Sequence, residues 1–187
     1  MTKRSHPLDR FARDLPAGRL EWIGLRPARR QPLRAVAMTE AIADRGLAGD
    51  HRSEKTPGSG RQVTVISREF IDQIALFLGR DAIDPGLLRR NLVVSGINLH
   101  ALRHQRFTIG ASVLLEAGAL CHPCSRMETN LGRGGVAAMF GHGGLCCRVL
   151  EGGTIRVGDP VAVSLAGLTG DLFGESRQSP IASSERT

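Results

Sequence analysis

The chain has 187 residues, enough for one domain with a sizeable core, and carries a formal net charge of +7. No run of 18 or more apolar residues occurs, which argues against a membrane span, and the charged segment 1–13 lacks the apolar stretch of a secretory signal. Four cysteines without such a signal indicate a reducing cytoplasm, where cysteine serves more often as a ligand or catalyst than in a disulfide.

The positive charge is almost entirely arginine, since Lys3 and Lys55 are the only lysines. One interpretation is an anionic partner such as a phosphate compound or nucleic acid, and the other is a solvated basic surface. The chain has no Tyr, one Trp and six Phe, so it offers few aromatic rings on which bases could stack. This composition argues against nucleic acid as the partner.

In chain order, residues 1–17 carry mixed charge and two prolines and predict a flexible lead. Short segments rich in β-branched residues then predict strands at 19–25, 35–42, 62–66, 91–94, 107–109, 113–116, 145–151, 154–157 and 161–165. Ser67 is suited to cap a helix whose apolar face is expected to pack in the core and which ends at Gly79; that face comprises Phe70, Ile71, Ile74, Phe77 and Leu78.

Glycines and prolines separate these segments. A turn is expected at 46–51, another at Pro85–Gly86, and an interrupted helical stretch over 128–140. The Gly/Ser-rich segment 166–187 predicts a loose tail, which leaves one domain over 18–165. Many short strands with glycine turns and a few short helices predict a mostly β (α+β) fold, arranged as a β-barrel.

The segment Cys121-His-Pro-Cys124-Ser-Arg126 is the strongest candidate for chemistry. Arg126 keeps its charge at physiological pH, and a nearby cation favours the nucleophilic thiolate. A CxxC pair can be a redox dithiol, but that motif belongs at a helix start within a βαβ unit. It can also belong to a zinc site, or Cys124 can act alone on a soft metal or a substrate.

Two further cysteines, Cys146 and Cys147, are adjacent in a predicted strand. Their side chains therefore point to opposite faces and do not readily chelate one ion together. We interpret them as small apolar residues, one of which faces the core. These considerations favour the interpretation in which Cys124 acts alone.

Several arginines stand where predicted strands begin after glycine or turn segments. They are Arg61 before Gln62, Arg89 and Arg90 before Asn91, Arg126 after Cys124, and Arg148. Guanidinium groups at such positions can bind phosphate oxygens in a bidentate manner. Each alone is expected to be a solvated charge, but together with a thiolate candidate they indicate a pocket for an anionic cofactor.

The order of these motifs resembles the MOSC domain, which occurs at the C-terminus of molybdenum cofactor sulfurases and as free-standing bacterial proteins. The matching pieces, spread over about residues 20–163, are Gly46-Leu-Ala-Gly-Asp50, Arg61-Gln-Val, Arg89-Arg-Asn91-Leu, Ile109-Gly110, Pro123-Cys124-x-Arg126, Gly144 and Glu151-Gly-Gly-Thr-Ile-Arg-Val-Gly158-Asp159. The chain most resembles the small stand-alone members.

The resemblance implies a MOSC-type β-barrel that binds the molybdenum cofactor, with Cys124 ligating the metal or carrying sulfur. Relatives with a known reaction reduce small N-hydroxylated compounds with electrons from a separate flavin or haem protein. The residues expected to hold the cofactor are Arg61, Gln62, Arg89, Arg90, Asn91, Arg126, Asp50 and His51. The pyridoxal-phosphate domain of the sulfurases, with its Schiff-base lysine, has no counterpart, so no such cofactor is expected on this chain.

Two features depart from the family pattern. Many relatives have Gly-Asp-Arg-His where this chain has Gly49-Asp50-His51-Arg52, and Met127 stands where some have a second cysteine. Cys121 is an additional thiol that could switch Cys124 off by forming a disulfide with it. The alternatives to a reductase are a sulfur carrier that uses a Cys124 persulfide and a non-catalytic module that binds a phosphate ligand or nucleic acid.

Overall fold

The computed structural model describes residues 9–55 and 57–164. Its elements are a 3-10 helix Asp9–Asp14 (η1), β1 Gly18–Leu25, β2 Arg34–Val36, β3 Met38–Ile42, β4 Gly46–Leu47, β5 Val63–Ser67, α1 Arg68–Phe77, α2 Pro85–Leu88, β6 Leu92–Ser95, a 3-10 helix Leu99–Leu102 (η2), β7 Arg106–Ile109, β8 Val113–Leu120, α3 Arg126–Leu131, α4 Gly135–Ala138, β9 Leu145–Glu151, β10 Gly153–Arg156 and β11 Pro160–Val163. The predicted lead thus contains η1 in its described part, while residues 1–8 and the predicted tail 166–187 lie outside the described residues.

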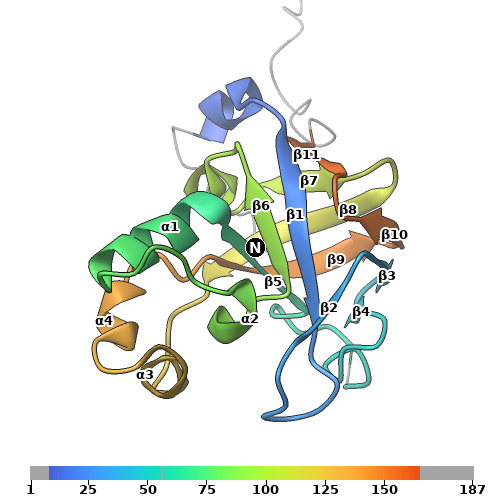
Figure 1. Ribbon diagram of the computed structural model, residues 1–187. Coiled ribbons are helices and arrows are strands. Elements are labelled where there is room, and N and C mark those ends of the chain that lie inside the picture. The colour runs from blue at the N-terminus through green and yellow to red at the C-terminus, as the bar shows by residue number, and fades with distance from the viewer. Residues whose placement is uncertain (1–8, 56, 165–187) are drawn as a thin grey trace, which may run out of the picture.

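Seven strands form a closed barrel (Figure 1), as the predicted fold class requires. They follow the order β11-β7-β8-β9-β5-β6-β1, and the ring closes because β1 also pairs with β11. β2 adds to β1, and a small second sheet has the order β10-β3-β4. All the pairings are antiparallel except that of β5 with β6, whose parallel arrangement requires the crossover that α1 and α2 provide.

Two apolar clusters stabilise this arrangement. The first fills the barrel and includes Val63, Val65, Leu92 and Val94, while the second lies between the barrel wall and the helices. Alternation along the strands separates them, because Ile66 of β5 and Val93 of β6 face outward and pack under the helices instead of entering the barrel. This is why β5 is buried along its whole length.

The helices differ from the prediction in two places. Ser67 caps α1 as expected, but Phe77, predicted to pack in the core, is 59% exposed and lies edge-on against the ring of His142. The predicted turn at Pro85–Gly86 is instead the helix α2. The carboxylate of Asp84 accepts a hydrogen bond from Gly86 N, and Pro85 occupies the first turn, where its missing N–H costs nothing.

The helices α2 and α3 and the loop between β1 and β2 lie at the same end of the barrel, at the bottom of Figure 1. The loop that connects α4 to β9 contains residues 141–144, three of which are glycines, and lies near these elements. Its last residue, Gly144, has a φ of 81°, and a Cβ there would overlap the carbonyl oxygen of Val65 on β5. The loop can approach β5 this closely only because residue 144 has no side chain.

We expect Gly144→Ala to destabilise the protein more than Gly141→Ala. Both glycines have a positive φ, of 81° and 82°, but a Cβ at Gly141 meets nothing within 4 Å. The difference isolates the overlap with Val65 and should amount to about 1–3 kcal/mol of unfolding free energy. Urea unfolding of both variants measures it, and equal losses would show that the close approach is unimportant.

Candidate functional site

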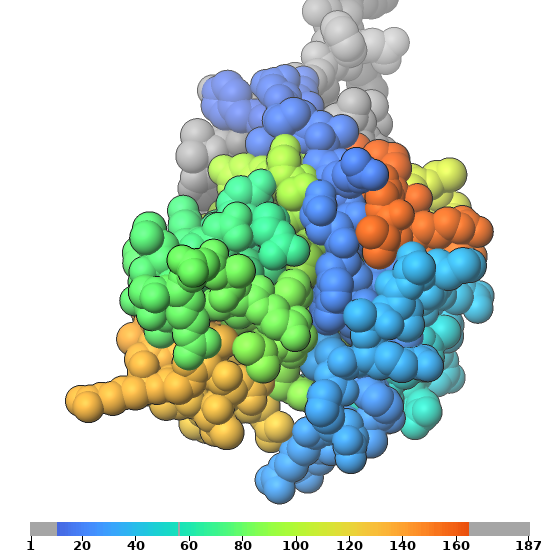
Figure 2. All heavy atoms as spheres, in the orientation of Figure 1, coloured from blue at the N-terminus to red at the C-terminus, as the bar shows by residue number. Residues whose placement is uncertain are grey.

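A cavity of about 220 Å³ opens at the lower end of the barrel. In Figure 2 the 26–32 loop and α3 face each other across a notch at the bottom of the molecule. Five chain segments contribute its lining, which consists of Arg26, Arg29, Arg30, His51, Arg52, Arg61, Arg89, Arg90, His122, Cys124, Arg126 and Met127. Eight of these twelve residues are arginines, and we call this cavity the arginine pocket.

Cys124 is the one exposed cysteine of the four in the chain. It stands just before α3, whose first residues Arg126 and Met127 also line the arginine pocket. Pro123 precedes it, which restricts the backbone, and the carbonyl of Cys124 accepts a hydrogen bond from Met127 N at 2.7 Å. The thiol is thus held at the pocket surface by the first turn of α3.

The arginines of the pocket repel one another. Burial lowers the pKa of Arg89, as does the charge of Arg126 nearby, and burial together with the charges of Arg26 and Arg61 lowers the pKa of Arg52. Among the described residues, Arg26 is the one pocket arginine that forms an ion pair with a carboxylate. A bound anion would relieve this repulsion, so the electrostatics favour a negatively charged ligand.

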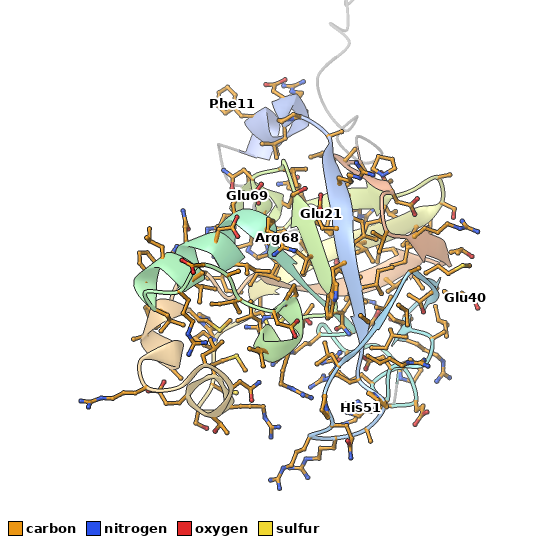
Figure 3. The ribbon with its side chains drawn as sticks, in the orientation of Figure 1. Phe11, Glu21, Glu40, His51, Arg68 and Glu69 are labelled. Atoms are coloured by element: carbon orange, nitrogen blue, oxygen red, sulfur yellow. The ribbon has the colours of Figure 1, made fainter. Side chains whose placement is uncertain are left out.

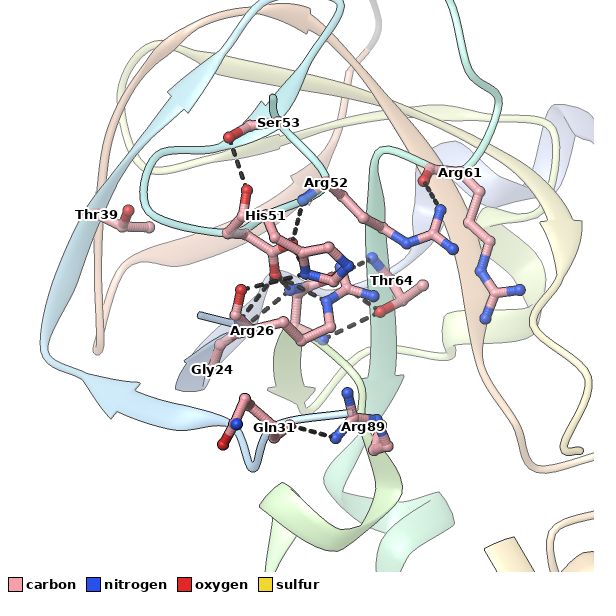
Figure 4. Close-up of polar contacts among 12 residues, drawn as sticks. Gly24, Arg26, Gln31, Thr39, His51, Arg52, Ser53, Arg61, Thr64 and Arg89 are labelled. Atoms are coloured by element: carbon pink, nitrogen blue, oxygen red, sulfur yellow. Dashed lines mark hydrogen bonds and ion pairs between the residues drawn. The ribbon is translucent and has the colours of Figure 1, made fainter. Parts of the chain in front are cut away.

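A buried polar network lies beneath the arginine pocket (Figure 4). Asp50 Oδ2 accepts hydrogen bonds from Arg26 Nε and Asn91 Nδ2, both at 2.8 Å, and Arg26 Nη2 donates to Asn91 Oδ1 at 2.7 Å. Thr64 donates to the same Asn91 oxygen through both its N and its Oγ1. The network joins the end of β1, the turn after β4 and the starts of β5 and β6, so it fixes the floor of the pocket.

Arg90 is buried, and its guanidinium holds three backbone carbonyls. Nε donates to Gly143 O at 2.6 Å, Nη1 to Leu88 O at 2.9 Å and Nη2 to Cys121 O at 2.9 Å. It therefore ties α2, the loop before β9 and the start of the cysteine segment together. Most of its donors are already used, so its main contribution to the pocket is positive charge and the placement of these loops.

The structure brings together most, but not all, of the residues expected to bind a cofactor. Cys124, Arg61, Arg89, Arg126, His51 and Arg90 line the arginine pocket, whereas Asp50, Asn91 and Gln62 do not. Asp50 and Asn91 belong to the buried network. Gln62 accepts from Val149 N and donates to Asp44 Oδ1, so its amide joins β5 to β9 and to the turn after β3.

Six further residues line the pocket that were not predicted to bind a cofactor: Arg26, Arg29, Arg30, Arg52, His122 and Met127. The pair Arg29–Arg30 lies in a loop bounded by Pro27 and Pro32. The sequence shows this basic loop but not that it lies beside the segment of Cys124. Arg52 lines the pocket beside His51, so both members of the transposed pair reach the same cavity. The exchange of positions therefore leaves this histidine at the site.

A family model described as the MOSC domain matches residues 52–162 of the chain. The chain belongs to the MOSC family. No curated protein sequence is significantly similar to it. The matched range contains Cys124 and the pocket arginines Arg52, Arg61, Arg89, Arg90 and Arg126, whereas Arg26 and Asp50 precede it. The buried network therefore connects the matched region to the end of β1.

Solved structures agree with this MOSC assignment at the level of the fold. The YuaD protein from Bacillus subtilis superposes with a TM-score of 0.69 at 20% identity, over 80% of this chain and 96% of that one. YiiM from Geobacillus stearothermophilus gives 0.63 at 16% identity, over 79% and 75%, and YiiM from Escherichia coli gives 0.57 at 16%, over 78% and 69%. No helix among the described residues has the length and apolar character that crossing a membrane requires.

We expect Asp50→Ala to lower the unfolding free energy by about 3–5 kcal/mol, because it leaves the Arg26 guanidinium buried without its partner. The side chains of Arg26 and Asp50 are 7% and 2% exposed. Glu40→Ala, which removes an exposed carboxylate from β3 (Figure 3), is the matched control and should change the unfolding free energy by less than about 0.5 kcal/mol. Denaturant unfolding at pH 7 gives both values; similar losses for the two variants would contradict the role of the network.

The same pair predicts a pH dependence. Burial opposes ionisation of Asp50, but the charge and hydrogen bonds of Arg26 prevail and hold the pKa of its carboxyl below the usual value. Its stabilising contribution is therefore complete above the unfolded-state pKa of about 3.9 and is lost as the pH falls through the lower folded-state pKa. The stability difference between wild type and Asp50→Ala should shrink below about pH 4.

Proposed function

We propose that this MOSC protein binds the molybdenum cofactor in the arginine pocket and serves as the reductase component for small N-hydroxylated compounds. The observation that carries the proposal is the placement of one exposed thiol, Cys124, at a cavity lined by eight arginines. A soft sulfur ligand beside a cluster of cations is the combination that a metal cofactor with a phosphate group requires.

The residues at the pocket fit this cofactor chemically. The Cys124 thiolate would ligate the metal, since thiolate suits soft, redox-active centres. Arg61, Arg89 and Arg126, which have no carboxylate partner among the described residues, would bind the phosphate. When bound, the cofactor supplies two-electron redox chemistry, while this chain binds and orients it.

The reduction of an N-hydroxylated compound consumes two electrons and two protons per turnover. We propose that a separate flavin or haem protein delivers the electrons. His51 and His122 both line the arginine pocket, and imidazole is the side chain best suited to donate protons near neutral pH. Within this proposal they are the groups that would protonate the departing oxygen.

Cys124→Ala should remove most of the bound molybdenum, because it deletes the proposed sulfur ligand. Ser125→Ala is the matched control: Ser125 is exposed, stands next to Cys124, and makes no side-chain cap to α3. The molybdenum and pterin contents of both variants, purified from a host that makes the cofactor, are measured by elemental analysis and pterin fluorescence. Full molybdenum retention in Cys124→Ala would refute the proposed ligand.

Arg126→Ala and Arg89→Ala should each weaken the binding of inorganic phosphate by about 10- to 100-fold, the effect of losing a charge-assisted hydrogen bond worth about 1.5–3 kcal/mol. The control is Arg156→Ala, which removes an exposed arginine from β10, outside the pocket. Titration calorimetry at fixed salt gives the affinities. An equal loss in Arg156→Ala would mean that the net charge alone, not the pocket, binds the anion.

The exposure of Cys124 also suits a second candidate function, in which its sulfur is carried as a persulfide and passed to an acceptor. Sulfur transfer by metal-free protein, lost in Cys124→Ala, would favour this carrier over the reductase. Salt-dependent phosphate binding that is indifferent to Cys124→Ser, with neither metal nor sulfur transfer, would leave a phosphate-binding module.

A further inference from the structure

Two other cysteines, Cys121 and Cys146, lie close to each other near the arginine pocket. Leu120 at the end of β8 pairs with Leu145 of β9, and Cys121 N donates to Gly144 O at 2.7 Å, so the antiparallel register continues to Cys121. In this register Cys121 and Cys146 project from the same face of the sheet as diagonal neighbours. Both are buried, at 1% and 5% exposure, whereas Cys147 points into the barrel.

The sulfur of Cys121 lies in a cationic environment. Arg61 Nη2 is 3.4 Å from Cys121 Sγ, and Arg90 holds the carbonyl of the same residue at 2.9 Å. A hydrogen bond from the Cys146 thiol, with the charges of Arg90 and Arg61, lowers the pKa of Cys121 to about 6 although burial opposes this. The same hydrogen bond raises the pKa of Cys146, so near neutral pH the pair consists of one thiolate and one thiol.

A second cavity, separate from the arginine pocket, borders one member of this pair. Cys146 borders this cavity of about 450 Å³ on the outer face of the barrel, together with Gly118 and Leu120. Arg61 borders both cavities. The outer cavity is thus lined by Cys146 and by two neighbours of Cys121, Leu120 and Arg61, and a change at the sulfur pair reaches the arginine pocket through Arg61.

We propose that Cys121 and Cys146 form a dithiol site that hydroperoxides oxidise to an intramolecular disulfide, and that this oxidation increases the affinity of the arginine pocket for anions. The Cys121 thiolate attacks the peroxide oxygen, forming a sulfenic acid and releasing water or an alcohol after protonation. The Cys146 sulfur then attacks Cys121 Sγ; the S–O bond breaks, and the hydroxide leaves as water with the proton of the Cys146 thiol. The two thiols lose two electrons, and the peroxide gains them.

The effect on the arginine pocket follows from charge. The disulfide is neutral, so oxidation removes the negative sulfur that lies 3.4 Å from Arg61 Nη2. The guanidinium of Arg61 then has no thiolate competing with a bound phosphate, and the pocket gains one unit of net positive charge. The removal of a charge a few ångströms from the binding site should strengthen phosphate binding by about three- to tenfold.

The pairing is tested by treating the purified full-length chain with stoichiometric hydrogen peroxide, blocking the remaining thiols and mapping the peptides by mass spectrometry. We expect a Cys121–Cys146 crosslink that persists in Cys124→Ser and is lost in both Cys146→Ser and Cys146→Ala. Thermal unfolding of the reduced variants verifies that they are folded. A Cys121–Cys124 crosslink in the wild type, or oxidation confined to the exposed Cys124, would overturn the proposal.

The consequence is tested with inorganic phosphate as the probe, by calorimetry on reduced and oxidised protein. Oxidised wild type and reduced Cys121→Ser, which both lack the buried thiolate, should bind phosphate about three- to tenfold more tightly than reduced wild type. Peroxide should not strengthen phosphate binding further in Cys121→Ser, which has no thiolate at this position to oxidise. Equal or weaker binding by the oxidised wild type would refute the link to Arg61. This result does not depend on whether the protein binds molybdenum, so it can fail while the proposed function stands.

Discussion

The arginine pocket depends on one buried ion pair, between Arg26 and Asp50. Eight guanidinium groups around one cavity repel one another, and such a cluster persists only if something fixes the backbone that carries them. Asp50 does this by accepting hydrogen bonds from Arg26 and from the Asn91 amide, which itself binds Thr64 on β5. One carboxylate thereby holds three barrel strands and a turn in the positions from which the other arginines extend.

Arg90 performs a comparable task through hydrogen bonds to backbone carbonyls instead of an ion pair with a carboxylate. Its contacts with Gly143 and Cys121 bring the loop before β9 against the segment that presents Cys124. The absence of a side chain at Gly144 allows the same loop to touch β5. The exposed thiol, the buried sulfur pair and the arginines are thus linked by hydrogen bonds and close packing at one end of the barrel.

Several parts of the fold were predictable because they depend on local pattern. Alternating and β-branched residues placed the strands of the barrel, and Ser67 marked the start of α1. The prediction was wrong at Pro85–Gly86, where the Asp84 cap makes a helical turn from residues that also suit a loop. It was also wrong for Phe77, since periodicity shows which residues share a helix face but not how far the barrel extends beneath it.

The MOSC fold, the candidate nucleophile Cys124 and the excess of arginine could all be inferred from the amino-acid sequence, because they depend on motif order and residue chemistry. Which partner each charged side chain contacts depends on the folded arrangement of distant segments. Arg61 and Arg90 have the same side chain, yet Arg61 borders two cavities, whereas Arg90 donates most of its hydrogen bonds to backbone carbonyls. Likewise Cys121 has Cys146 as its sulfur partner, although Cys124 is nearer in sequence, because strand register brings residues of β8 and β9 together and sequence distance does not.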